Sequence, residues 1–182
     1  MTEPTLTPEE ALESLEADLK SPEFCASRFN TFDVEGASLE GDTLTVSLTA
    51  TPSAFLRCPK CGRRDFENAG EKVLTLKDAP YLGHKLAVRL TLPEVKCKHC
   101  GTVTAIRELA WFISPVSLPC TQRFVNTFED IYLHAKEGAD LTAAYASLGL
   151  TQEEASTLTM NILDKLLTQV GQESPTLRRA RR

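Results

Sequence analysis

Four of the six cysteines stand in two Cys-x-x-Cys pairs, Cys58 with Cys61 and Cys97 with Cys100, and a glycine follows each pair. A gap of two residues in a tight turn lets both sulfurs of a pair reach the same metal ion. Four thiolates complete a tetrahedral shell and leave no open position for water, which excludes the hydrolytic chemistry of open zinc sites. The spacing predicts one structural zinc ion bound by these four cysteines, with an iron cluster or a redox pair as the alternative.

The other cysteines and the histidines show no such spacing. Cys25 and Cys120 have apolar neighbours in the sequence, so we expect buried free thiols rather than a nucleophilic pair. His99 lies between the cysteines of the second pair, but four sulfurs already suffice, and we expect it on the surface. His84 and His134 have no partner at ligand spacing.

Length and composition are those of an ordinary globular protein, with 182 residues of which 42% are hydrophobic. No apolar run approaches the roughly 18 to 20 residues of a membrane-spanning helix, and the N-terminus is acidic where a signal peptide would be basic. We therefore expect a cytoplasmic protein with reduced thiols. The sequence contains no P-loop, G-x-G-x-x-G, G-x-S-x-G or H-E-x-x-H motif, so we expect no enzymatic activity.

The net charge of −5 is unevenly distributed: residues 1–51 carry −9, residues 52–136 carry +5 and residues 137–182 carry −1. A basic middle segment suits phosphate binding, although zinc with four thiolates would add about −2 to it. Ordinary solvated surface is the alternative explanation for both the basic and the acidic residues. The candidate phosphate contacts are Arg57, Lys60, Arg63, Arg64, Lys96, Lys98, Arg107 and Arg123, with Arg178, Arg179, Arg181 and Arg182 in the tail.

The N-terminal segment predicts a helix followed by a β-hairpin. Thr7 and Glu10 form a capping box before a helix with one apolar stripe and an acidic outer face. Apolar and hydroxyl side chains alternate from Thr43 to Thr49, which predicts a half-buried strand with Phe29 to Val34 as its partner.

A second hairpin is predicted between the cysteine pairs, from strands at Val73 to Leu76 and Leu86 to Leu92. The 35 residues that separate Cys61 from Cys97 exceed the usual spacing of about 15 to 20. We therefore expect a zinc ribbon with an inserted β-hairpin.

From Thr121 onward the apolar spacing becomes helical. We predict one helix that ends near Gly138, a second over Leu141 to Leu148 capped by Asp140, and a third to about Gly171. Thr151 and Glu154 form a capping box at the start of the third. The predicted fold class is α+β, divided into an acidic N-terminal helix and hairpin (1–51), a zinc ribbon (52–116), a helix-turn-helix-like bundle (117–171) and a disordered basic tail (172–182).

Three stretches carry a resemblance to a known family: Cys58-Pro59-Lys60-Cys61-Gly62, the residues from Leu76 to Leu90, and Cys97-Lys98-His99-Cys100. They resemble the N-terminal part of bacterial insertion-sequence transposases of the ISL-three type, in which a zinc ribbon precedes a helix-turn-helix. With the following helices, the resemblance covers residues 55–170. It implies binding to the double-stranded DNA end of a mobile element. Because 11 residues follow Gly171 in this sequence, we do not expect the family's catalytic domain or strand transfer.

The last helix departs from that family. It opens with Thr151-Gln152-Glu153-Glu154, where a recognition helix would present basic or amide side chains, so Gln152 is the one residue here suited to a base. A helical bundle that packs on itself or on a second copy is the alternative. We expect a non-catalytic, zinc-binding, DNA-associated accessory or regulatory protein. The competing hypothesis is an adaptor or inhibitor that binds protein through its acidic N-terminal face.

Overall fold

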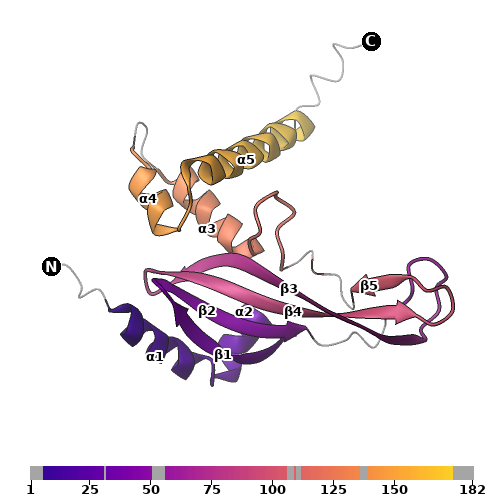
Figure 1. Ribbon diagram of the computed structural model, residues 1–182. Coiled ribbons are helices and arrows are strands. Elements are labelled where there is room, and N and C mark those ends of the chain that lie inside the picture. Colours follow the sequence, from indigo (N-terminus) through magenta and orange to yellow (C-terminus); the bar gives the residue numbers. More distant parts are fainter. Residues whose placement is uncertain are drawn as a thin grey trace, which may run out of the picture.

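The computed structural model describes residues 6–30, 32–50, 56–105, 109, 112–135 and 139–173. These residues form a mixed α+β fold with five helices and a five-stranded sheet (Figure 1). Arg107, Gly138 and the arginines of the tail lie outside the described residues. The elements are α1 (Pro8–Asp18), α2 (Pro22–Phe29), β1 (Phe32–Glu40), β2 (Thr43–Ala50), β3 (Phe66–Tyr81), β4 (His84–Cys97), β5 (Val103–Ala105), α3 (Gln122–Leu133), α4 (Thr142–Ser147) and α5 (Gln152–Glu173).

The strands lie in the order β1-β2-β4-β3, and β5 pairs with β4. All pairs are antiparallel except β2 with β4, which runs parallel from Thr43 opposite Lys85 to Thr49 opposite Thr91. One edge of β4 therefore pairs first with β2 and then with β5, while β3 covers the other edge. The sheet joins strands on both sides of residue 51, where the sequence predicted a boundary between segments.

β3 and β4 form a long hairpin that reaches the cysteines. Leu82 and Gly83 both have positive φ, 48° and 82°, as a two-residue type I′ turn requires. The strands are 16 and 14 residues long, so the predicted strands at 73–76 and 86–92 were too short. The reason is that residues 67–73 of β3 are exposed on both faces, so no apolar alternation marks them in the sequence.

α1 and α2 cover one face of the sheet (Figure 1). Alternate residues of β2 and β4, including Leu48 and Leu90, are fully buried together with Leu15 of α1 and Phe29 of α2. The capping box of Thr7 with Glu10 is present as predicted. The predicted hairpin partner from Phe29 to Val34 is confirmed in part: residues 32–34 pair antiparallel with β2, but Phe29 ends α2 and β1 continues to Glu40.

The other three helices form a second core on the opposite side of the sheet (Figure 1). α3 is capped by Thr121 and ends at Leu133, short of the predicted end. The N-cap of α4 is Leu141, so the prediction of Asp140 was wrong by one residue, although Asp140 still accepts a hydrogen bond from the Thr142 amide. Thr151 and Glu154 exchange both hydrogen bonds of a capping box before α5, as predicted.

A buried carboxylate fixes α3 against β3. Asp78 is 1% exposed and accepts hydrogen bonds from the Thr121 hydroxyl, at 2.5 Å, and from the Arg123 guanidinium. A carboxylate loses its hydration when it is buried, and the hydrogen bonds from these donors offset the free-energy cost of that loss. Within the part of the chain that the structure describes, no helix is both long and apolar enough to cross a membrane.

Candidate metal centre

The two cysteine pairs meet at the end of the β3–β4 hairpin that is remote from its tight turn. Cys97 is the last residue of β4 and lies opposite Phe66, the first residue of β3. Cys58 and Cys61 lie in the turn that precedes β3, and Cys100 lies in the turn between β4 and β5. The antiparallel register thus brings together residues that are 36 and 42 positions apart in sequence.

The two turns have the same backbone geometry. The amide of Gly62 donates to the carbonyl of Cys58, and that of Gly101 donates to the carbonyl of Cys97, both at 2.8 Å. The two glycines have φ of 71° and 70°, a conformation that other residues adopt with strain. The repeated turn presents both sulfurs of each pair to one side, which is the local arrangement that a shared metal ion needs.

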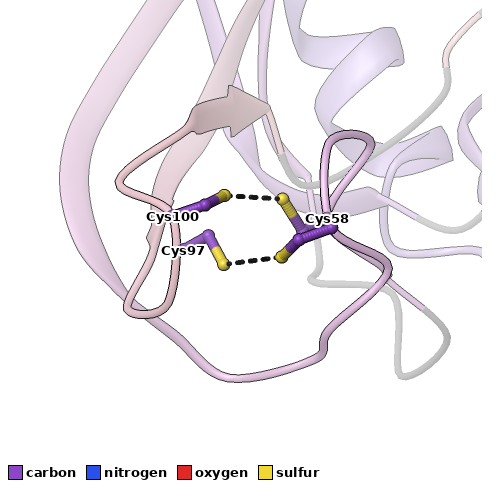
Figure 2. A group of neighbouring side chains, drawn as sticks. Cys58, Cys97 and Cys100 are labelled. Atoms are coloured by element: carbon purple, nitrogen blue, oxygen red, sulfur yellow. Dashed lines mark hydrogen bonds between the residues drawn. The ribbon is translucent and has the colours of Figure 1, made fainter.

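All four sulfurs lie within 4.8 Å of one another. Cys58 Sγ is 3.5 Å from Cys100 Sγ, and Cys61 Sγ is 3.6 Å from Cys97 Sγ (Figure 2). A metal–sulfur bond of about 2.3 Å in a tetrahedral shell separates neighbouring sulfurs by about 3.8 Å. A disulfide requires about 2.05 Å, and all four cysteines are free. The site is therefore spaced to hold one metal ion.

The thiols of the cluster have different acidities. Hydrogen bonds with the side chain and the backbone of Thr102 lower the pKa of Cys100 to about 6. A backbone hydrogen bond from Arg63 lowers the pKa of Cys61, but burial and the neighbouring sulfurs together outweigh it and raise the value to about 12. A metal ion binds the thiolate form, so its arrival would displace protons from this cluster. No spacing in the sequence marked Thr102 as a partner of the cysteines.

The remaining candidate ligands lie elsewhere. His99 is exposed, and the group of potential ligands among the described residues contains only the four cysteines. The His84 ring nitrogen Nε2 is 2.9 Å from the carbonyl oxygen of Leu6. Cys120 is fully buried, and burial raises its pKa to about 11. Cys25 is half-buried, and its thiol donates to the carbonyl of Leu19.

The predicted phosphate contacts divide into two groups. Arg57, Lys60, Arg63 and Arg64 flank the first cysteine pair, are exposed, and form no ion pair with the described residues. We call these four residues the basic knuckle. Lys96 and Lys98, by contrast, pair with Glu67 at 3.4 Å and Asp65 at 2.9 Å.

Two further candidates lie in the helical region. Arg123 is occupied by the buried Asp78, so its inclusion among the phosphate contacts was wrong. The sequence gave no sign of this pairing, because the two residues are 45 positions apart. Gln152 is exposed at the start of α5, beside the exposed Glu153. Glu154 is engaged with Thr151 and with Lys77 of β3.

In comparisons with known proteins, no protein-family model, no curated protein and no solved structure matches the chain.

Proposed function

We propose that the four clustered cysteines hold one structural Zn²⁺ ion and that the basic knuckle beside them binds the phosphates of double-stranded DNA. Sulfur-only ligation favours zinc among the common metals, and a closed Cys₄ shell suits a structural role. The chain would then be a non-catalytic, DNA-associated accessory or regulatory protein. A zinc ion with four thiolates carries about −2, which the four cations of the basic knuckle exceed.

The observation that carries the DNA proposal is the exposure of the basic knuckle, which has no acidic partner among the residues that the structure describes. Its four exposed residues lie between positions 57 and 64, in and beside the turn of the first cysteine pair, which would let them approach neighbouring phosphates together. The acidic helix α1 lies at the other end of the sheet, away from β5 and the cysteine turns (Figure 1). This separation keeps the main source of repulsion away from a bound duplex.

The same proposal gives α4 and α5 a supporting role. A short turn around Gly149, where φ is 69°, connects α4 to α5, as a helix-turn-helix would require. The exposed N-terminus of α5 nevertheless shows Glu153 beside Gln152, and a carboxylate there repels phosphate. We assign phosphate contact to the basic knuckle and leave at most a single base contact to Gln152. This division fits a protein derived from, or similar to, the end-binding region of a transposase.

Metal content and identity are tested first. Purified protein is expected to contain one zinc per chain by elemental analysis. Replacement with Co²⁺ is expected to give the absorption of a tetrahedral four-sulfur site. Strong visible absorption with stoichiometric iron would instead indicate an iron–sulfur cluster, and well-folded protein without metal would contradict the site altogether.

DNA binding is tested by fluorescence anisotropy with a random-sequence duplex over a salt series. Replacing Arg63 and Arg64 together by Ala is expected to weaken binding to every sequence alike. It should also reduce the slope of log K against log salt by about one per lost contact. The matched control replaces Lys85 and Lys165 by Ala, which changes the net charge equally but removes cations already paired with Asp42 and Glu129. Equal losses in the two variants would contradict a localised basic knuckle.

A protein-binding adaptor is the second candidate, because α5 exposes large apolar side chains. Met160 is 59% exposed and Leu167 is 70% exposed. Exposed apolar residues on one helix suit a partner or a second copy of the chain. If the duplex is not bound at low salt by the zinc-loaded protein, this candidate replaces the DNA proposal. A concentration-dependent mass in solution then tests self-association.

A further inference from the structure

β1 forms one margin of the sheet, and among the described strands it pairs only with β2. Along the other edge of such a strand, backbone N–H and C=O groups point away from the sheet and can pair with another chain. A bulge interrupts β1 between Val34 and Gly36. Gly36 has φ of 152°, and a Cβ there would meet no heavy atom of a described residue within 4 Å beyond its chain neighbours. Another main chain can therefore approach β1 closely at this point.

A hollow of about 320 Å³ lies between β1 and the C-terminal end of α1. Residues 34–37 line it from β1, and Glu16, Leu19 and Lys20 line it from the helical side. Because the side chains of consecutive strand residues alternate between faces, a hollow lined by four in a row opens at the edge of the strand. α1 packs chiefly against β1, so the helix and the edge strand are the walls of one groove (Figure 1).

Both walls of this groove are acidic. α1 contains five acidic residues and β1 three, and neither element contains a basic residue. Glu16 and Glu35 line the hollow, are exposed, and form no ion pair with a described residue. Among the described residues of the lining, Lys20 is the one cation. The partial negative charge at the C-terminus of α1, whose last turn has no basic residue, adds to the negative potential.

We propose that a basic, extended segment of a partner protein binds in this groove and adds a strand to the free edge of β1. Its main chain pairs with the edge, and one Arg or Lys side chain enters the hollow. The apolar stem of that side chain lies against Leu19, Val34 and Ala37. Its charged end reaches Glu16 and Glu35. Backbone pairing provides affinity for an extended peptide, and the carboxylates select a basic one.

A second copy of the chain fits this edge poorly. Pairing between two β1 strands would place the acidic residues of both strands near one another, and like charges on paired strands repel. A bulge also hinders pairing between identical edges. The inference does not rest on DNA binding, because the hollow shares no residue with the basic knuckle. The two proposals can therefore fail separately.

The probe is a short synthetic peptide in which Arg and Val alternate, titrated into the full chain at low, constant ionic strength and followed by fluorescence anisotropy. The wild-type protein is expected to bind it saturably, and amide exchange in β1 is expected to slow near residues 36–40. The same peptide with methylated backbone amides keeps its charge but cannot pair as a strand, so it should bind about tenfold more weakly. A peptide in which Glu and Val alternate should not bind.

Glu16→Gln combined with Glu35→Gln removes both carboxylates of the hollow and is expected to weaken binding of the Arg–Val peptide about fivefold or more. The matched control combines Glu9→Gln with Glu23→Gln, which changes the net charge equally at exposed positions outside the hollow. It should bind within about twofold of the wild type. The proposal is overturned if the Arg–Val peptide does not bind, if the methylated peptide binds as tightly, if both double variants lose affinity equally, or if exchange slows elsewhere but not in β1.

Discussion

Lys77 of β3 and Glu154 of α5 form an ion pair of 2.9 Å between residues 77 positions apart in sequence. The same ammonium group donates to the carbonyl of Gly149 at 2.7 Å. One lysine therefore holds both the turn before α5 and the first turn of that helix against the sheet. The two side chains are 32% and 26% exposed, so solvent screens this pair less than it screens a fully exposed one.

Replacing Lys77 by Met should lower the free energy of unfolding by about 1 to 3 kcal/mol, because it leaves two partly buried acceptors without their donor. Lys85→Met is the control, since Lys85 forms an exposed pair with Asp42. That change should cost less than about 0.5 kcal/mol. Urea denaturation of both variants measures the difference, and equal effects would show that Lys77 does not hold α5 in place.

The stability contributed by Glu154 should depend on pH. Burial alone would raise its pKa, but hydrogen bonds from the Thr151 backbone and from Lys77 outweigh burial and bring the value below the ordinary 4.5. A carboxylate with a lowered pKa in the folded state contributes its full stabilisation above the unfolded value and loses it as the pH falls through the folded value. Gln can keep the capping box at this position but not the charge. The stability difference between wild type and Glu154→Gln should therefore be largest near neutral pH and decrease below about pH 4.5. Glu67→Gln, at an exposed pair with Lys96, serves as the comparison in the same denaturation series.

Loss of the metal should unfold only one end of the molecule. Cys58 and Cys97 are outside the main core, which is formed by α1, α2 and the strands. We expect Cys97→Ser to speed amide exchange of β5 and of the adjoining end of β4 by at least about tenfold. The amides of Leu86 to Leu90 should keep their protection. Cys25→Ser removes a thiol outside the cluster and is the control; global unfolding of Cys97→Ser, or no change at all, would contradict a local role for the metal.

The acidic face of α1 should oppose DNA binding at long range. Deleting the helix would not test this, because Ala11 and Leu15 are fully buried. Changing the exposed Glu9, Glu13 and Glu16 to Gln leaves that packing intact. At low salt the triple variant should bind duplex DNA a few-fold more tightly. At high salt, where the screening length falls to a few ångströms, the difference should disappear. Weaker binding by the triple variant would indicate that α1 contributes to the interface.

The structural features that were predicted most accurately are those that depend on residues close together in the sequence. The two capping boxes, the alternation along β2, and the paired cysteine turns with their glycines all follow from spacings of a few residues. α2 was missed, although Ser21 and Pro22 are ordinary start signals, because its eight residues are too few to show a period.

Contacts between distant segments could not be predicted in the same way. The parallel pairing of β2 with β4 and the burial of Asp78 against Arg123 depend on the complete fold. Neither has a local signature, since the strands alternate equally well in any register and an isolated Asp or Arg is usually exposed. For this reason Arg123 was assigned to phosphate binding.

The parallel pairing of β2 with β4 also fixes an order of events during synthesis. β2 ends at Ala50 and β4 begins at His84, so the ribosome makes 33 residues between them, which takes about two to seven seconds at typical rates. During that interval, the edge of β2 that pairs with β4 in the folded protein has no hydrogen-bonding partner strand. Cys97 is the last residue of β4, so the strand that joins β2 to β3 is complete just as the second cysteine pair is being made. A nascent chain can therefore acquire its four-sulfur site only after the strand that joins β2 to β3 has been made.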